Sequence, residues 1–227
     1  MLKNKKLVLA VLAITLVGVI AISFTLAYFT DSHEVTNTFT LGDLDIDLDE
    51  PVWKDGDGDN LAPGDIMIKD PVVYATTGDG YMRLIMTITD ENGITITDTT
   101  RLAKILETLY YDESGALDLT VKYSASDLAA LGLPQFNDTS FELDTVRTAA
   151  AGNGVYVYNY ISNNGIFEEG SDVQFMSHVV IPSNWNQSDF TVLAGPYKII
   201  FRAEAVQAKG FADAAEAFTA LDAELNP

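Results

Sequence analysis

Residues 43–49 read Asp-Leu-Asp-Ile-Asp-Leu-Asp, and this strict alternation is the strongest local constraint on the fold. Successive side chains of a β-strand point to opposite faces, so the apolar residues Leu44, Ile46 and Leu48 share one face and the aspartates share the other. We expect the apolar face to be core. The aspartates favour a solvated outer face that discourages aggregation at a sheet edge, with cation binding as the alternative.

The apolar residues just before this strand are out of step with it. Phe39 and Leu41 alternate with each other, but they differ from Leu44 by one residue in register. Gly42 lies between them, so we expect a β-bulge or bend there that restores the apolar face.

Further strands and a few helices are predicted downstream. The predicted strands are residues 81–89, 155–161, 172–181 and 197–208, and the first of them has Met82, Leu84, Met86 and Ile88 on one face. Helices are predicted at residues 99–110, at a short segment that begins at Ser126 and stops before Gly132 and Pro134, and at residues 211–221 with Phe211, Ala215 and Phe218 on one stripe. The Ala- and Gly-rich residues 145–154 are predicted to be a loop.

This pattern favours a mainly β fold. Long connections, inserted helices and the lack of a βαβ rhythm fit a jelly-roll-like two-sheet β-sandwich better than an α/β fold. The 48% apolar content is enough to fill the core of one large β-domain.

The N-terminal 27 residues have the three parts of a secretory signal peptide. Lys3, Lys5 and Lys6 precede a long apolar run, and Ala27 supplies the small residue at its end. We therefore expect residues 1–27 to be the signal peptide, cleavage between Ala27 and Tyr28, an extended arm at 28–41 and a β-sandwich domain at 42–227. The alternative is a retained membrane anchor, because residues 7–29 are uncharged and about 20 apolar residues cross a bilayer.

Composition agrees with export. The chain has no cysteine, so neither disulfides nor thiol chemistry are available to it. Removal of the signal peptide takes away three lysines and no acidic residue, which changes the net charge from −20 to −23. Nucleic acid is excluded as a partner, since its phosphates would be repelled, and anionic lipid is disfavoured.

Several short motifs, in order along the chain, resemble the TasA/camelysin family. The N-terminal ones are residues 27–31 (Ala-Tyr-Phe-Thr-Asp), 37–42 (Asn-Thr-Phe-Thr-Leu-Gly) and 45–48 (Asp-Ile-Asp-Leu). Next come Pro63-Gly64-Asp65, Lys69-Asp70-Pro71 and Tyr81-Met82-Arg83. The closing motifs are residues 181–185 (Ile-Pro-Ser-Asn-Trp), 195–197 (Gly-Pro-Tyr) and 203–208 (Ala-Glu-Ala-Val-Gln-Ala).

The resemblance implies a secreted or surface-retained bacterial protein with a jelly-roll-like core. In the best-known members it implies assembly into biofilm matrix fibres, in which the mature N-terminal segment completes the sheet of the next subunit. The implied partners are other copies of the chain in a head-to-tail homopolymer, a SipW-type signal peptidase during export, and an anchoring or minor matrix protein.

The arm itself has the character of a donated strand. Its apolar residues Tyr28, Phe29, Val35, Phe39 and Leu41 are too sparse to fold alone, yet its Thr and Val content suits a strand. Added to an open sheet edge of a neighbour, it would make a head-to-tail contact that propagates without closing. The sequence thus predicts a non-enzymatic, fibre-forming or surface matrix protein.

A surface metalloendopeptidase, the activity with which this family has also been labelled, is the alternative. The His-Glu-x-x-His motif of many zinc peptidases is absent, because His33-Glu34 has no second histidine one turn later and His178 lies far away. Serine hydrolase chemistry is not supported either. No Gly-x-Ser-x-Gly motif occurs, and we expect Ser177 and His178 to point to opposite faces of a strand.

Two ligand-binding alternatives remain open. Asp55, Asp57 and Asp59 have the spacing with which an EF-hand loop begins, so Ca²⁺ is a candidate cofactor, with Glu50 or Asp65 as extra ligands. The motif then fails at Asn60 and Ile66, and a polar turn between strands fits the same residues. The aromatic face of the strand at 155–161, formed by Tyr156, Tyr158 and Tyr160, suggests either a carbohydrate-binding platform or core packing.

Overall fold

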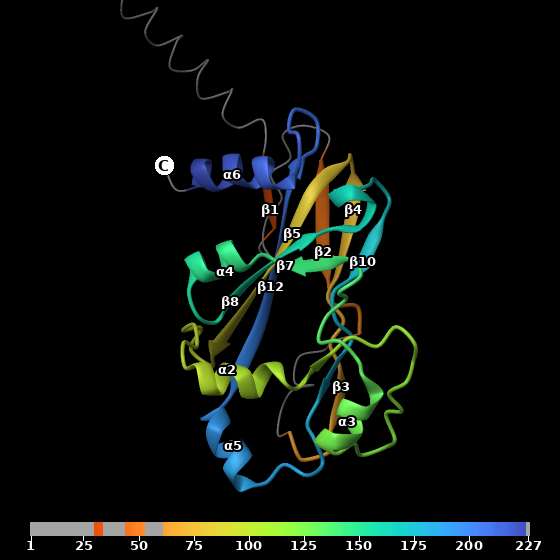
Figure 1. The fold of residues 1–227 in the computed structure, drawn as a ribbon, viewed down its shortest axis with the longest axis vertical. Coiled ribbons are helices and arrows are strands. Elements are labelled where there is room, and N and C mark those ends of the chain that lie inside the picture. Colours follow the sequence, from red (N-terminus) through yellow and green to blue (C-terminus); the bar gives the residue numbers. More distant parts are fainter. Residues whose placement is uncertain (1–29, 34–43, 53–60, 226–227) are drawn as a thin grey trace, which may run out of the picture.

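The computed structural model describes residues 30–33, 44–52 and 61–225, and its largest sheet is antiparallel (Figure 1). The order of its strands is β1 (Thr30–His33), β12 (Tyr197–Gln207), β5 (Gly80–Asp90), β8 (Val155–Tyr160) and β7 (Phe141–Leu143), and β9 (Ile166–Phe167) also pairs with β5. The two longest strands, β5 and β12, pair along their whole length.

Two smaller antiparallel sheets accompany it. One has the order β10 (Asp172–Gln174), β4 (Val72–Thr77), β2 (Asp45–Asp49), and the other β3 (Ile66–Ile68), β11 (His178–Val180), β6 (Leu109–Tyr110). The mainly β fold class predicted from the sequence is therefore confirmed for the described residues.

The helices lie around these sheets. They are α2 (Thr99–Leu106), α3 (Ala125–Leu131), α4 (Thr145–Ala151), α5 (Gln187–Leu193), α6 (Ala214–Leu225) and the 3₁₀ turn η1 (Ser162–Gly165). In Figure 1, α6 lies near β1 at one end of the large sheet, and α5 lies at the opposite end. Within the described part of the chain, no helix is both long and apolar enough to span a bilayer.

One apolar core joins the three sheets. Ile46 of β2, Leu84 of β5, Val173 of β10, Val179 of β11 and Ala203 of β12 all belong to the same buried cluster. The apolar faces of the three sheets thus pack against one another, as a β-fold of this composition requires.

The alternating strands predicted from the sequence are confirmed. In β2, Ile46 is fully buried while Asp47 and Asp49 are exposed, as period-2 alternation requires. On β5, the four residues expected on one face are all buried in the main core: Met82, Leu84, Met86 and Ile88.

The prediction of one strand over residues 172–181 is wrong. The segment forms β10, which pairs with β4, and then β11, which pairs with β3 and β6 in another sheet. Between them Phe175 and Met176 are buried, and the amide of Asn137 donates to the carbonyl of Phe175. The chain therefore passes through the core at Phe175 and Met176, between two short strands that belong to different sheets.

One helix prediction and one loop prediction also need correction. The predicted helix at 99–110 ends at Leu106, because Leu109 and Tyr110 pair with β11 as strand β6. The predicted loop at 145–154 contains α4, capped by Asp144, whose side chain accepts the amide N–H of Arg147.

The two other predicted helices exist with shifted bounds. The N-cap of α3 is Ser124, two residues before the expected start, and Gly132 is its C-cap. The buried face of α6 consists of Ala217, Phe218 and Leu221, whereas Ala215 of the expected stripe is exposed.

Candidate functional site

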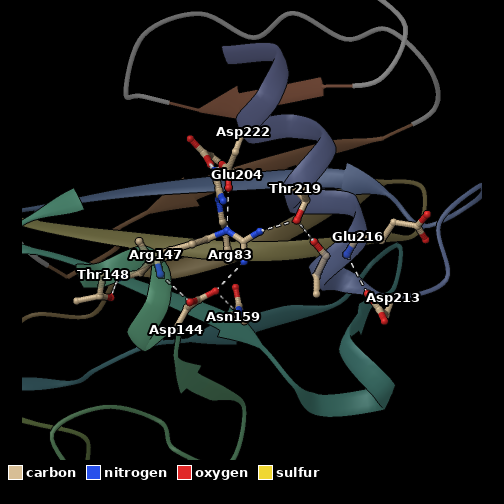
Figure 2. Close-up of polar contacts among 12 residues, drawn as sticks. Arg83, Asp144, Arg147, Thr148, Asn159, Glu204, Asp213, Glu216, Thr219 and Asp222 are labelled. Atoms are coloured by element: carbon tan, nitrogen blue, oxygen red, sulfur yellow. Dashed lines mark hydrogen bonds and ion pairs between the residues drawn. The ribbon is translucent and has the colours of Figure 1, made fainter. Parts of the chain in front are cut away.

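A cluster of ion-paired side chains lies between the large sheet and α6 (Figure 2). Arg83 of β5 and Glu204 of β12 stand directly opposite each other in the sheet. Arg83 Nε donates to Glu204 Oε2 at 2.6 Å, and Glu204 is completely buried. The other oxygen of Glu204 forms an ion pair with Arg202. A buried carboxylate is stable only with such partners.

Asp222 of α6 connects this pair to a second arginine. It accepts from Arg83 Nη2 at 2.6 Å and from Arg147 Nε, on α4, at 2.8 Å. The guanidinium of Arg83 also lies 4.7 Å from the ring centroid of Phe218, a cation–π distance. Burial opposes ionisation of Asp222, but the hydrogen bonds from the two arginines outweigh it and hold the pKa of this carboxyl below its ordinary value.

Asp144 completes the cluster from the side of α4. Its carboxylate accepts from Arg147 Nη1 at 2.8 Å and from Asn159 Nδ2 at 3.0 Å, besides capping the helix. Burial would raise the pKa of Asp144, but its hydrogen bonds outweigh this effect and lower the pKa. The hydrogen bond from the backbone amide of Arg147 has the largest lowering effect.

The charged side chains of the cluster pair with one another within the chain. The arginines at 83, 147 and 202 balance the carboxylates at 144, 204 and 222, and each of these carboxylates is engaged by at least one arginine. The ion-paired carboxylates of Asp144 and Asp222, whose pKa values are lowered, make poor general bases at neutral pH. The arrangement therefore ties α4 and α6 to the large sheet.

Two motifs that carry the family resemblance meet in this cluster. Arg83 closes the motif Tyr81-Met82-Arg83, and Glu204 lies in the motif at 203–208. The sequence predicts both segments as strands but does not indicate that these two residues pair. A charged residue inside each of two apolar strands was the available signal, since such charges are rarely buried without a partner.

Ser177 and His178 are closer than expected. The sequence predicts opposite faces, yet Ser177 Oγ lies 2.7 Å from His178 Nδ1, because β11 begins only at His178 and strand alternation does not apply to Ser177. Ser177 is buried, and its hydroxyl accepts the amide N–H of Asp112 at 2.8 Å. The carboxylate of Asp112 accepts from the amides of its own loop, that of Leu117 at 2.7 Å among them. The three residues fix a loop and do not form a nucleophile–base–acid relay.

The described residues do not provide a zinc centre. No group of three or more His, Cys, Asp or Glu side chains that could hold a metal ion occurs among them. His178 lies in a strand, as predicted, and burial lowers its pKa although Asp112 and Asp70 act in the opposite direction. The Nδ1 atom of His178 forms a hydrogen bond with the hydroxyl of Ser177. We derive no metal-dependent step from this arrangement.

The aromatic face of β8 is core. Tyr158 is buried against Phe136 and Phe175, with ring centroids 4.8 Å apart in each pair. Tyr160 packs on Phe141 and Phe167. The packing interpretation is confirmed for Tyr158 and Tyr160, whose rings contact other rings of the core.

Most of the remaining candidate residues lie outside the described residues. These are the cleavage site at Ala27 and Tyr28, the arm residues Phe29, Val35, Phe39 and Leu41, the expected bend at Gly42, and the calcium candidates Asp55, Asp57 and Asp59. Of the extra calcium ligands considered, Glu50 accepts Lys69 Nζ at 2.6 Å and Asp65 accepts the amide of Ala62 at 2.7 Å.

The part of the arm that the structure describes is already a strand. Residues Thr30–His33 form β1, which pairs antiparallel with residues 203–206 of β12 in the same chain. The pairing places Thr30 opposite Val206 and His33 opposite Ala203. Strand β12 extends beyond this pairing to Tyr197.

These features define a mainly β protein whose described polar cluster joins two helices to the inner strands of its largest sheet. Residues 2–99, from the N-terminal apolar run to the start of α2, match the model of the camelysin metallo-endopeptidase family. The TasA/camelysin resemblance inferred from the sequence is confirmed over this stretch. Searches of the curated proteins and of the solved structures gave no significant match.

Proposed function

We propose that the protein is a secreted or cell-surface structural protein that assembles head-to-tail by donating its N-terminal strand to the next copy. The observation that carries the proposal is the β1–β12 pair, in which residues 30–33 lie as a strand at the edge of this sheet. In the fibre, β1 of one copy would take the same place on β12 of its neighbour. The match to the camelysin family supports the surface location, and a core shared by all three sheets supports a jelly-roll-like sandwich.

The register of this pair predicts how a longer donated strand would sit. Asp31 lies opposite Ala205 and His33 opposite Ala203, and both alanines belong to the main core. In the same register, Val35 would lie opposite Phe201 and Phe39 opposite Tyr197. These odd-numbered positions then share the core side, where apolar side chains are stabilised by burial.

The even-numbered positions give a matched control. In the same register, Thr36 would lie opposite Ile200 and Thr38 opposite Lys198, two residues of β12 that are exposed. Replacing Val35 and Phe39 with Asp should abolish fibres, whereas replacing Thr36 and Thr38 with Asp should leave them. Negative-stain microscopy of the purified mature variants measures this. Fibres of normal morphology from the first variant, or from a chain lacking residues 28–38, would refute strand donation.

The proposal also requires a free N-terminus. Cleavage after Ala27 would begin the mature chain at Tyr28, only two residues before β1. The intact mass of the secreted protein tests this. A chain that still begins at Met1 and stays in the membrane fraction would make the apolar run an anchor and exclude donation of a free arm.

The description of the matched family favours a second candidate, a surface metalloendopeptidase. Casein cleavage by the purified mature protein, measured with and without EDTA, separates the two. We expect no cleavage. Chelator-sensitive cleavage that disappears in a His178→Ala variant would assign the activity to this chain.

A further inference from the structure

We propose that α6 is a latch that holds β1 on its own sheet. The inference rests on the proposed function, because it concerns what keeps β1 from leaving for another copy. It starts from the position of α6. The buried residues Ala217, Phe218 and Leu221 pack on Val206 of β12 and on Tyr81 of β5. Val206 is the partner of Thr30 in β1, so α6 covers the same stretch of β12 to which β1 is paired.

A chain of close polar contacts leads from the helix to that stretch. Arg83 Nη2 donates to Asp222 Oδ1, on α6, at 2.6 Å. Arg83 Nε donates to Glu204 Oε2, on β12, at 2.6 Å. Glu204 is the partner of Ser32 in the pairing register of β1 and β12. Loss of the Asp222 contact therefore removes one of the two carboxylates that orient Arg83 next to the β1–β12 pair (Figure 2).

The helix can leave as a unit. Its N-terminal end is capped from within, because the amide of Glu216 donates to Asp213 at 2.9 Å and the amide of Ala212 donates to Glu216 at 2.7 Å. Gly210, in the connection from β12, has a φ of 109° and open space around it. A rotation there does not disturb the sheet.

The edge strand depends on this support. Among the described strands, β1 is a four-residue edge strand paired on one side with β12, and elements with few stabilising contacts open most readily. When α6 is docked, β12 is fixed and β1 remains paired within its own chain. When α6 opens, β1 exchanges more readily with the corresponding strand of another copy.

Hydrogen exchange of the monomeric mature protein, measured by mass spectrometry, tests the latch. Asp222→Asn keeps the side-chain shape and removes the charge, and Glu224→Ala on the exposed face of α6 is the control. In Asp222→Asn we expect amides of residues 214–225 to exchange roughly tenfold to a hundredfold faster, because hydrogen bonds to charged groups are lost. Amides of residues 30–33 should also exchange faster. Residues 83–87 in the β5–β8 pair and the Glu224→Ala control should match the wild type.

Each other outcome overturns the latch. Unchanged exchange in α6 would show that Asp222 does not hold it, and faster exchange in α6 alone would show that β1 is independent of it. Faster exchange throughout β5 and β8 would mean general destabilisation. Failure of the wild-type protein to form fibres would refute the proposed function. The latch would still be tested, because hydrogen exchange is measured on the monomer and does not require fibres.

Discussion

The buried pair of Arg83 and Glu204 gives the sharpest quantitative prediction. Glu204 is completely buried and the side chain of Arg83 is 5% exposed, so replacing the glutamate leaves a buried guanidinium short of one carboxylate. Breaking a buried ion pair from one side costs about 3 to 5 kcal/mol. Arg83 retains Asp222, so for Glu204→Leu we expect the lower end, a loss of about 3 kcal/mol in the free energy of unfolding. This is a large part of the roughly 5 to 15 kcal/mol that stabilises a typical domain.

Urea unfolding followed by circular dichroism measures this loss. With a slope of about 2 to 3 kcal/mol per molar urea, the midpoint should fall by roughly 1 to 1.5 M without a change in slope. Glu142→Gln is the control, because Glu142 lies in the same sheet, opposite Asn159, but is exposed. It should change the free energy by less than about 0.5 kcal/mol.

A double variant distinguishes the ion pair from simple packing. Arg83→Leu combined with Glu204→Leu removes both charges, so it should cost clearly less than the sum of the two single changes. A loss below about 1 kcal/mol for Glu204→Leu, or additive single losses in the double variant, would refute the view that this pair is a coupled, buried unit.

Three further predictions concern single positions. Ala194, at the C-cap of α5, has a φ of 52°, so Ala194→Gly should relieve strain and raise the free energy of unfolding, measured in urea, by about 1 kcal/mol. Gly154 has a φ of 87° and an added Cβ would lie 2.1 Å from the carbonyl oxygen of Ile96, so Gly154→Ala should lower the melting temperature by an amount equivalent to about 2 kcal/mol or more. The lowered pKa of Asp222 means that its stabilising effect is present above the ordinary carboxyl pKa of about 3.9 and is lost as the pH falls through the lower folded value. The stability difference between wild type and Asp222→Asn should therefore be constant from pH 7 to 5 and shrink below about pH 4, and a difference that begins to shrink near pH 6 would contradict this assignment.

Local patterns in the sequence predicted the elements whose environment is set by their own residues. Alternation in β2 and β5 requires one buried face whatever the partner strand is, so these strands were predictable. The helix α4 has a signal of its own in the sequence, because Asp144 before it and Gly152 after it are capping residues, whereas its high Ala and Gly content predicts a loop.

Only the tertiary structure decided where the other segments end and what they touch. Leu109 continues the apolar spacing of α2, yet it pairs with Val179 of β11, and this contact between distant segments overrides the helical pattern. Arg83 and Glu204 are 121 residues apart, and no local periodicity indicates that they are partners. The sequence by itself determined which faces must be buried, because burial depends on the character of each side chain. The tertiary structure decided which charges meet inside, because an ion pair depends on two positions that only the folded sheet brings together.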